Sequence, residues 1–327
     1  MKKYGHYKNL ASCVTMDLFS NITISKERYD YMLRLSRLLA ISLTMVLLFT
    51  GCLSQGPTAG EAEDTEKSEP LKKLTTREVI AKTQKVTNEA KGLTFKTEGN
   101  QKIQLEVAGQ TQGIDQKINM DVKMTNNPAA MHFSGTVEGG GQSGKLEAYQ
   151  VGDEIYQQLD GTWVKGKGAD LSQASGGQAE DPSKALEMLM EILSKFKGDK
   201  DTPFQMEETE DEYIITLKVT DEQKEIKELM MKQLSGALVP AMKQAGVTIN
   251  ETDIKLNSLE QVYHIDKKTF DQKKVDQSME LELPIQEGGI SGLIKVEQST
   301  ATTMTGKFEG TIEVPQEVKD QAREISM

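Results

Sequence analysis

The sequence predicts an α+β fold in which a broad antiparallel sheet has one dry face covered by a few amphipathic helices. Apolar and polar residues alternate strictly over many segments, which is typical of strands with one buried and one solvated face. Stretches with helical periodicity interrupt these segments, so the order along the chain is helix, strands, helices, strands. No stretch of linker composition divides them, and we expect a single domain over residues 74–327.

The first predicted element is a helix over residues 76–91. It opens on Thr75-Thr76-Arg77-Glu78, the pattern of a capping box, in which a hydroxyl and a carboxylate satisfy free backbone amides. A run of strands follows, and Asp160-Gly161 between two of them is a hairpin signal because both turn positions can take positive φ. These strands are expected over residues 103–107, 118–124, 131–137, 145–151, 154–159 and 162–165.

Two further helices are predicted in the second half. One begins at Asp181-Pro182 and carries an apolar stripe that ends at Phe196. The other follows a capping box that runs from Thr220 to Gln223, and Pro240 is expected to kink or shorten it. Residues 166–181 are expected to form a flexible excursion, either a lid or a plain loop. The remaining strands are expected over residues 213–219, 254–265, 275–283, 293–297 and 304–314.

Residues 1–51 are interpreted as a leader with a lipoprotein signal peptide. Arg34 and Arg37 precede the apolar run 38–49, which is shorter than the roughly 20 residues that a membrane-spanning helix needs. The residues that follow resemble the bacterial lipobox, in which a cysteine receives a diacylglyceryl group before cleavage, although phenylalanine stands where leucine is usual. The lipobox consists of Phe49, Thr50 and Gly51, followed by Cys52 as the lipidation site.

The alternative is a short uncleaved anchor, and both interpretations place the rest of the chain outside the cytoplasm, anchored to the cell membrane. Acidic residues before Met32 do not fit a signal peptide, so we hypothesise that translation starts at Met32. Residues 52–73 are polar, acidic and poor in aromatic residues, which predicts a disordered tether behind the lipidated cysteine.

The composition argues against several function classes. The formal net charge is −11 and no basic cluster with aromatic residues offsets it, so we expect no nucleic-acid binding. Only two cysteines are present and Cys13 lies in the leader, so no disulfide is expected. His132 and His264 lie far apart in strand-like segments without a second ligand at suitable spacing, and we predict no metal site and no cofactor.

The sequence also lacks the motifs of common enzymes, and we expect no catalytic residues. It has no nucleophile elbow, no zinc-protease motif and no phosphate-binding loop. Residues 139–144 are rich in glycine but lack the lysine of a phosphate loop, which favours a long hairpin tip. The acidic run 207–212 offers carboxylates to calcium but lacks the spacing of a calcium loop, which favours a solvated hairpin.

Methionine is the residue type that points to a ligand. The chain has 16 methionines, and many occupy the dry faces of the predicted strands and helices. Their flexible thioether side chains suit either an apolar cavity for acyl chains or an irregular core that is poor in aromatic residues. The candidate cavity residues, chosen from periodicity, are Met120, Val122, Met124, Met131, Phe133, Leu189, Leu193, Leu229, Met230, Met279 and Leu281.

Two segments resemble the lipoprotein-carrier superfamily, which includes chaperones of the LolA/LolB type, the LppX/LprG lipoproteins and uncharacterised bacterial surface lipoproteins. They are residues 259–270, LEQVYHIDKKTF, and the hairpin of residues 149–166, YQVGDEIYQQLDGTWVKG. The resemblance implies a curved half-barrel of antiparallel strands, with helices packed on its concave face and an apolar cavity for lipid or lipid anchors. It implies no fixed catalytic residues.

The sequence therefore favours a membrane-anchored extracytoplasmic lipoprotein that binds a lipid or other apolar ligand between sheet and helices, as a carrier would. Its expected partners are the membrane, through diacylglyceryl-Cys52, and a lipid or lipidated ligand, whereas no protein partner is indicated. The alternative is a non-catalytic cell-surface interaction or structural module with a filled core.

Replacing Cys52 by serine is expected to abolish lipidation, because the diacylglyceryl group is attached to the thiol of that residue. Incorporation of labelled fatty acid and the distribution of the protein between membrane and soluble fractions measure the effect. The Cys13→Ser variant is the matched control and should keep both the label and the membrane association. A Cys52→Ser protein that still takes up label and stays on membranes would contradict the lipobox interpretation.

Overall fold

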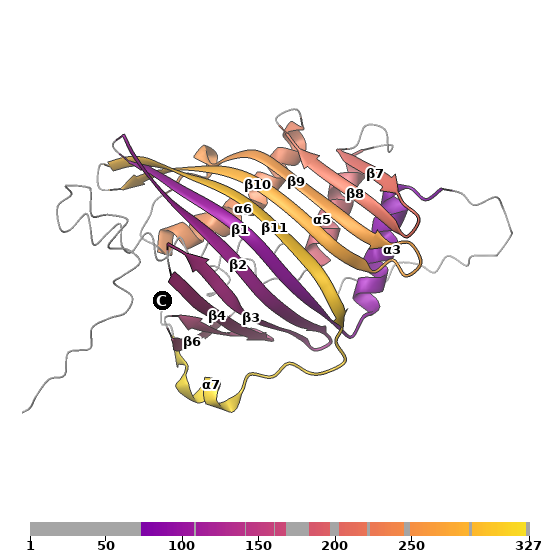
Figure 1. The fold of residues 1–327 in the computed structure, drawn as a ribbon, viewed down its shortest axis with the longest axis horizontal. Helices are drawn as coiled ribbons and strands as arrows, with labels where there is room; N and C mark the ends of the chain where they lie inside the picture. Colours follow the sequence, from indigo (N-terminus) through magenta and orange to yellow (C-terminus); the bar gives the residue numbers. More distant parts are fainter. Residues whose placement is uncertain are drawn as a thin grey trace, which may run out of the picture.

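The structure is a computed structural model that describes residues 73–107, 109–140, 142–159, 161–167, 183–196, 203–220, 223–244, 249–287 and 290–324. All twelve described strands belong to one sheet, in the order β12-β6-β5-β4-β3-β2-β1-β11-β10-β9-β8-β7 (Figure 1). Neighbouring strands are antiparallel, except for the short parallel pair of β12 and β6. The edge strands β12 and β7 do not pair with each other, so the sheet is open.

The first six strands form one meander. Their bounds are β1 (Gly92–Val107), β2 (Gln110–Asn126), β3 (Ala129–Gly139), β4 (Gln142–Val151), β5 (Glu154–Leu159) and β6 (Thr162–Lys167). The glycine-rich segment between β3 and β4 makes a tight turn, since Gly139 already pairs with Gln142 and Gly140 has a φ of 57°. A long hairpin tip, as expected from the sequence, is therefore not formed.

The later strands form a second meander, which joins the first at the centre of the sheet. Their bounds are β7 (Phe204–Glu208), β8 (Glu212–Val219), β9 (Lys255–Asp266), β10 (Gln272–Glu287) and β11 (Ile290–Lys307), with β12 (Arg323–Glu324) at the far edge. β1 pairs with β11 from Leu93 opposite Lys307 to Val107 opposite Gly292. The register shifts once, between Thr94 and Phe95, and is unbroken from Phe95 to Val107. Over this unbroken part the two meanders share the same inner and outer faces.

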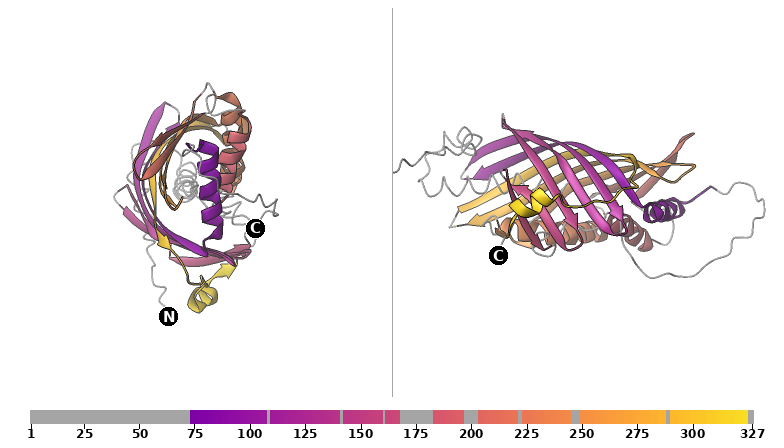
Figure 2. Two further views of the ribbon diagram at one scale, coloured as in Figure 1. Left: turned by 90° about the vertical axis from the view of Figure 1, so that its right-hand side faces the viewer. Right: turned by 90° about the horizontal axis from the view of Figure 1, so that it is seen from below.

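Three helices pack on the concave face of this curved sheet. They are α3 (Thr76–Glu89), α5 (Ser183–Ser194) and α6 (Lys224–Gln244), and Figure 2 shows the sheet curving around them. A short 3-10 helix, η4 (Glu251–Asp253), precedes β9. The arrangement confirms the predicted α+β half-barrel with helices on its concave face.

The predicted capping box sets the start of α3. The backbone amide of Glu78 donates to the Thr75 hydroxyl (3.2 Å), and the Thr75 amide donates to the Glu78 carboxylate (2.8 Å). The guanidinium of Arg77 in the first turn donates to the backbone carbonyl of Leu193 and ties α3 to α5. The helix ends at Glu89, slightly before the expected residue.

Alternation of buried and exposed residues explains how the sheet and helices join. In β10, Val275, Met279, Leu281 and Leu283 are buried at every second position and face the helices. The main apolar core lies between β7–β11 and the three helices. The helical residues buried in this core are Val79, Ile80, Leu189, Ile192, Leu193, Ile226, Met230, Leu234, Leu238 and Met242.

Two expectations about the ends of elements need correction. Of the two effects expected of Pro240, shortening of the helix does not occur, since α6 continues to Gln244 with Leu238 and Met242, on either side of the proline, almost fully buried in the core. The two strands expected over 293–297 and 304–314 are one strand, β11, which ends at Lys307. The chain then leaves the sheet and forms a short helix, α7 (Gln316–Gln321).

The segment around α7 packs on the opposite, convex face of the sheet, against β4–β6, and Figure 2 shows it outside the curve of the strands. It contributes Val314 and Val318 to a buried aromatic cluster with Tyr149, Tyr156 and Trp163. These three aromatic residues belong to the hairpin region whose pattern resembles the carrier superfamily. This outer layer was not expected from the sequence.

The alternation in β10 predicts a large difference in stability between two neighbouring substitutions. Leu283→Ala is expected to lower the free energy of unfolding by about 2–5 kcal/mol, because Leu283 is 0% exposed and its removal leaves a cavity. Glu282→Ala, at the adjacent outward position, should change it by less than about 0.5 kcal/mol. Urea unfolding followed by circular dichroism measures both, and equal losses would contradict the assigned faces.

Candidate functional site

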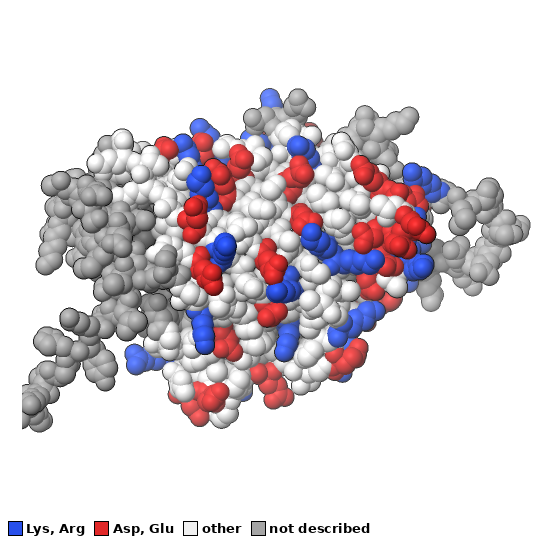
Figure 3. All heavy atoms as spheres, in the orientation of Figure 1, with Lys and Arg blue, Asp and Glu red and all other residues white. Residues whose placement is uncertain are grey.

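The inner face of the central strands is free of charged side chains. Every inward residue of four strands is uncharged over the ranges Phe95–Val107 in β1, Gln110–Met124 in β2, Val275–Ile285 in β10 and Ile290–Thr302 in β11. The outward positions of the same strands carry many lysines, aspartates and glutamates, which intersperse both signs of charge over the convex face (Figure 3). The sheet thus separates a charged surface from an uncharged concave one.

All strand residues predicted to line a cavity occur on this inner face. The register places Met120 beside Thr97, Val122 beside Phe95 and Phe133, and Met124 beside Leu93 and Met131. Met279 and Leu281 face the same way on β10. The sequence therefore predicted their orientation correctly, because a period of two is decisive for an amphipathic strand.

The candidate residues do not form one continuous lining in the described part of the chain. Val122 and Met124 pack with Met131 and Phe133 against β1, and Met120 packs with Ile118 in a small separate cluster. Leu189, Leu193, Met230, Met279 and Leu281 belong to the main core instead, with Leu229 partly buried against it. The structure thus divides the candidates between the β1–β3 face and the close-packed region beneath the helices.

A belt of buried polar side chains crosses the same inner face, and the sequence analysis did not single it out. Gln101 stands directly opposite Gln116 on β2 and Gln298 on β11. These three side chains are 2%, 7% and 5% exposed. The sequence signal that could have identified them is a glutamine at a strand position where the alternation of apolar and polar residues predicts an inward, apolar side chain.

Other members of the belt are hydrogen-bonded. The Gln261 amide donates to Gln277 (2.7 Å), and the Tyr263 hydroxyl donates to Gln261 (2.8 Å). Burial raises the pKa of Tyr263. The Thr97 and Thr302 hydroxyls are 2.9 Å apart and bond to each other.

In contrast, the three aligned glutamines contain buried atoms without a hydrogen-bond partner. Both amide atoms of Gln101, Nε2 and Oε1, have no partner, and the same holds for Oε1 of Gln116 and Nε2 of Gln298. Buried polar groups in folded proteins are nearly always paired, since an unpaired one loses its hydration without compensation. We call Gln101, Gln116 and Gln298 the carboxamide cluster.

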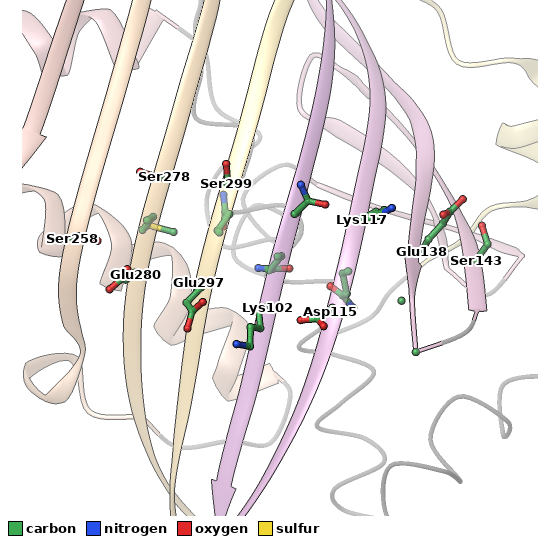
Figure 4. A pocket seen from close by; sticks show the side chains of 17 residues that line it. Lys102, Asp115, Lys117, Glu138, Ser143, Ser258, Ser278, Glu280, Glu297 and Ser299 are labelled. Carbon is green, nitrogen blue, oxygen red and sulfur yellow. The ribbon is translucent and has the colours of Figure 1, made fainter.

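Two adjacent hollows lie on the charged convex face. One has a volume of about 860 Å³ and is lined by residues at three consecutive positions on neighbouring strands. The first and third of these positions carry exposed side chains such as Lys102, Glu297 and Lys117 (Figure 4). The second, of about 470 Å³, shares Asn100, Lys117 and Ser299 with the first. Met279 is the single predicted cavity residue in the first lining. These polar troughs do not match the apolar cavity expected from the sequence.

Charged groups on the convex face at the β8–β9–β10 end are tied to one another. His264 Nδ1 lies 3.2 Å from Glu212, and Lys273 lies 3.3 Å from Glu212 and 3.0 Å from Asp266. His264 and then Lys273 lower the pKa of Glu212. The Thr269 amide, Lys273 and the Lys268 amide hold the pKa of Asp266 well below its usual range. These carboxylates are structural partners of cations at a hairpin end.

The other candidate groups also have ordinary partners. His132 stacks on Tyr149, and its Nε2 lies 3.3 Å from Glu147, which also accepts from the Tyr149 hydroxyl. Burial and this hydrogen bond raise the pKa of Tyr149 to about 12. In the acidic run 207–212, Glu208 pairs with Lys267 at 2.7 Å. Within the described ranges, no group of three or more histidine, cysteine, aspartate or glutamate side chains is arranged to hold a metal ion.

The predicted lipobox, Cys52, the tether and the loop 168–181 lie outside the described residues. Among the helices that the structure describes, none combines the length and the apolarity needed to cross a membrane.

The fold and its inner face define an open antiparallel half-barrel with an uncharged concavity and a charged convex surface. Residues 75–323 match the family described as a family of unknown function, DUF6612, and the chain belongs to that family. No curated protein matches the chain.

The chain is loosely similar to several solved structures. LprF from Mycobacterium bovis is 11% identical, with 73% of this chain and 95% of that chain covered and a TM-score of 0.30. A DUF1329 family protein from Desulfovibrio piger ATCC 29098 is 10% identical over 72% of this chain and 93% of its own, with a TM-score of 0.20. Lipovitellin is 6% identical over 68% of this chain and 26% of its own, with a TM-score of 0.28. Similarities this loose carry no argument about a ligand or an activity.

The hydrogen bonds of Asp266 predict a pH-dependent contribution to stability. Its folded-state pKa is depressed, so the stabilisation is fully present above the unfolded value of about 4 and is lost as pH falls through the folded pKa. Asp266→Ala should therefore lower the melting temperature at pH 7, and the difference from wild type should shrink towards pH 2. Thermal scans from pH 2 to 7 test this, with Asp115→Ala as an exposed control. A difference that stays constant with pH would contradict the assignment.

Proposed function

We propose that this protein is a membrane-anchored extracytoplasmic lipoprotein that binds a lipid or another apolar ligand between its sheet and helices and carries it. The observation that supports this proposal is the uncharged inner face of a strongly amphipathic, open sheet. An enclosed ligand of this kind is held mainly by apolar contact, which is non-directional and favours side chains that adapt to its shape. The proposal includes no catalytic step.

The inner face of β1–β3 is the proposed bed for the ligand. Leu93, Phe95, Val122 and Met124 form one apolar patch there, and Met131 and Phe133 extend it. The main core beneath α3, α5 and α6 takes no buried residue from β2–β6. The described helices therefore fill the half under β7–β11, where Ile103 of β1 joins the main core, and leave the rest of the β1–β3 inner face to its own two small clusters.

The anchor is the second part of the proposal. A diacylglyceryl group on Cys52 would fix the protein to the membrane, and residues 52–73 would let the half-barrel reach away from the bilayer. This arrangement suits a domain with net negative charge, since anionic headgroups repel it.

A second candidate function is a non-catalytic cell-surface interaction or structural module with a filled core. The dense packing of the main core beneath the helices favours it, because many of its residues are almost completely buried. The two candidates differ in what the inner face of β1–β3 contacts in solution.

Mass spectrometry of small molecules released from protein purified without detergent from its native host tests the carrier proposal. We expect a lipid in stoichiometric amount, retained because apolar chains leave an apolar bed slowly. Repeated absence of lipid, together with no uptake of an added fluorescent acyl probe, would favour the filled-core module instead.

A charge on the proposed bed is expected to weaken binding of the acyl probe. Met120→Lys places an ammonium group on the inner face, where desolvation is unfavourable, and should reduce the probe's affinity at least tenfold. Asn119→Lys adds the same charge at the neighbouring exposed position and should leave the affinity unchanged. Circular dichroism verifies that both variants are folded, and equal affinities in two folded variants would contradict the location of the bed.

A further inference from the structure

We propose that the carboxamide cluster is a polar subsite that holds the uncharged hydrogen-bonding group of an otherwise apolar ligand, such as the glycerol ester region of a diacylglycerol. This inference rests on the proposed function and adds the chemical class of the head group. It arises from buried amide atoms that the protein itself leaves unpaired.

The three glutamines converge because of strand register. Gln101 is the direct cross-strand neighbour of both Gln116 and Gln298, and directly opposed residues have Cβ atoms about 4.5–5.5 Å apart. All three alternate along their strands with buried apolar residues, so they face the concavity. Gly139 stands opposite Gln116, and a Cβ there would lie 2.8 Å from Gln116 Cγ, so the glycine leaves space for the glutamine side chain.

The unpaired atoms distinguish this cluster from the hydrogen-bonded glutamine pair of β9 and β10. Gln261 and Gln277, on the adjacent strands β9 and β10, satisfy each other at 2.7 Å in the same uncharged environment. Gln101 and Gln298 are equally buried and face each other, yet both keep an Nε2 without an acceptor. A ligand that accepts hydrogen bonds from these amides would pair groups that are buried and unpaired in the free protein. Such a ligand would bind more tightly than a hydrocarbon of the same size.

The chemistry of the cluster defines the ligand class. A carboxamide can donate through Nε2 to an ester carbonyl and accept through Oε1 from a hydroxyl, and it carries no charge. The inward positions of β1, β2, β10 and β11 offer no cation to pair with a phosphate or a carboxylate. An anionic head group would therefore be buried without compensation, whereas a neutral ester or hydroxyl group would be satisfied.

The surroundings of the cluster suit two apolar chains. Along β1, Ile103 follows the carboxamide row, and Phe95 and Leu93 lie beyond it on the other side. Ile103 is opposite Val296, and Phe95 is opposite Val122. A polar group centred on Gln101 would thus have Ile103 and Val296 on one side and, beyond the hydrogen-bonded Thr97 and Thr302, Phe95 and Val122 on the other.

Competition binding tests the inference. The full chain is synthesised in a cell-free system without lipid, and its inner face is occupied by diphenylhexatriene, a hydrocarbon probe. A diacylglycerol and the phosphatidic acid with the same two chains then compete with the probe. We expect the diacylglycerol to displace the probe at a concentration about tenfold lower than the phosphatidic acid does.

Variants locate the effect. Gln101→Leu combined with Gln298→Leu should lower the affinity for the diacylglycerol about tenfold, as loss of one or two hydrogen bonds would, and leave diphenylhexatriene binding unchanged. Gln104→Leu, at an outward position of β1, is the matched control. If the double variant does not fold, the single Gln298→Leu variant is measured in its place, with the same expected direction.

The outcomes separate this inference from the proposed function. Binding of the probe with equal affinity for both lipids, or with no effect of the glutamine substitutions, would overturn the polar subsite and leave the carrier proposal in place. If the wild-type chain binds neither the probe nor either lipid, both proposals are overturned. Weaker binding of the diacylglycerol by the glutamine variants, with unchanged binding of diphenylhexatriene, supports the subsite.

Discussion

The pairing of β1 with β11 is the interaction on which the rest of the structure depends. It brings together strands from opposite ends of the folded chain and turns two separate meanders into one twelve-stranded sheet. Side chains alternate with a period of two. A shift of one residue between β1 and β11 would therefore place the inward side chains of one meander on the same face as the outward side chains of the other. The apolar opposition of Ile103 with Val296, and of Phe95 with Met304, opposes such a slip, because it would expose these side chains on the charged surface.

The same register sorts charge. Lysines and acidic residues on the convex face remain hydrated and pair with each other, which costs little. The concave face contains only apolar residues and uncharged polar ones in its central strands, and some of the polar ones are hydrogen-bonded, such as Thr97 with Thr302 and Gln277 with Gln261. Gln101, Gln116 and Gln298 keep unpaired amide atoms side by side in one cross-strand row. An apolar concavity with a small neutral polar centre is the arrangement expected of a site for a ligand with two kinds of surface.

The helices give the two halves of the concavity different properties. Under β7–β11, side chains of α3, α5 and α6 fill the space, and Arg77 fixes two of these helices to each other. On the other side of the sheet, α7 and the aromatic residues Tyr149, Tyr156 and Trp163 support β4–β6 from outside. The β1–β3 region lies between these two supported regions. Apart from Ile103 in β1, the residues of its inner face that are buried lie outside the main core.

The sequence by itself determined the class of fold and the direction of the side chains. Period-two alternation decided that Met124, Phe133 and Leu281 face inward, and the Thr75 capping box set the start of α3, since both signals are local. Only the tertiary structure decided which inward residues meet. Met120 and Met279, both predicted to line one cavity, lie in different clusters, and Gln101 was not predicted to lie opposite Gln298. Register between strands far apart in the chain determines such neighbours, and no local pattern contains that information.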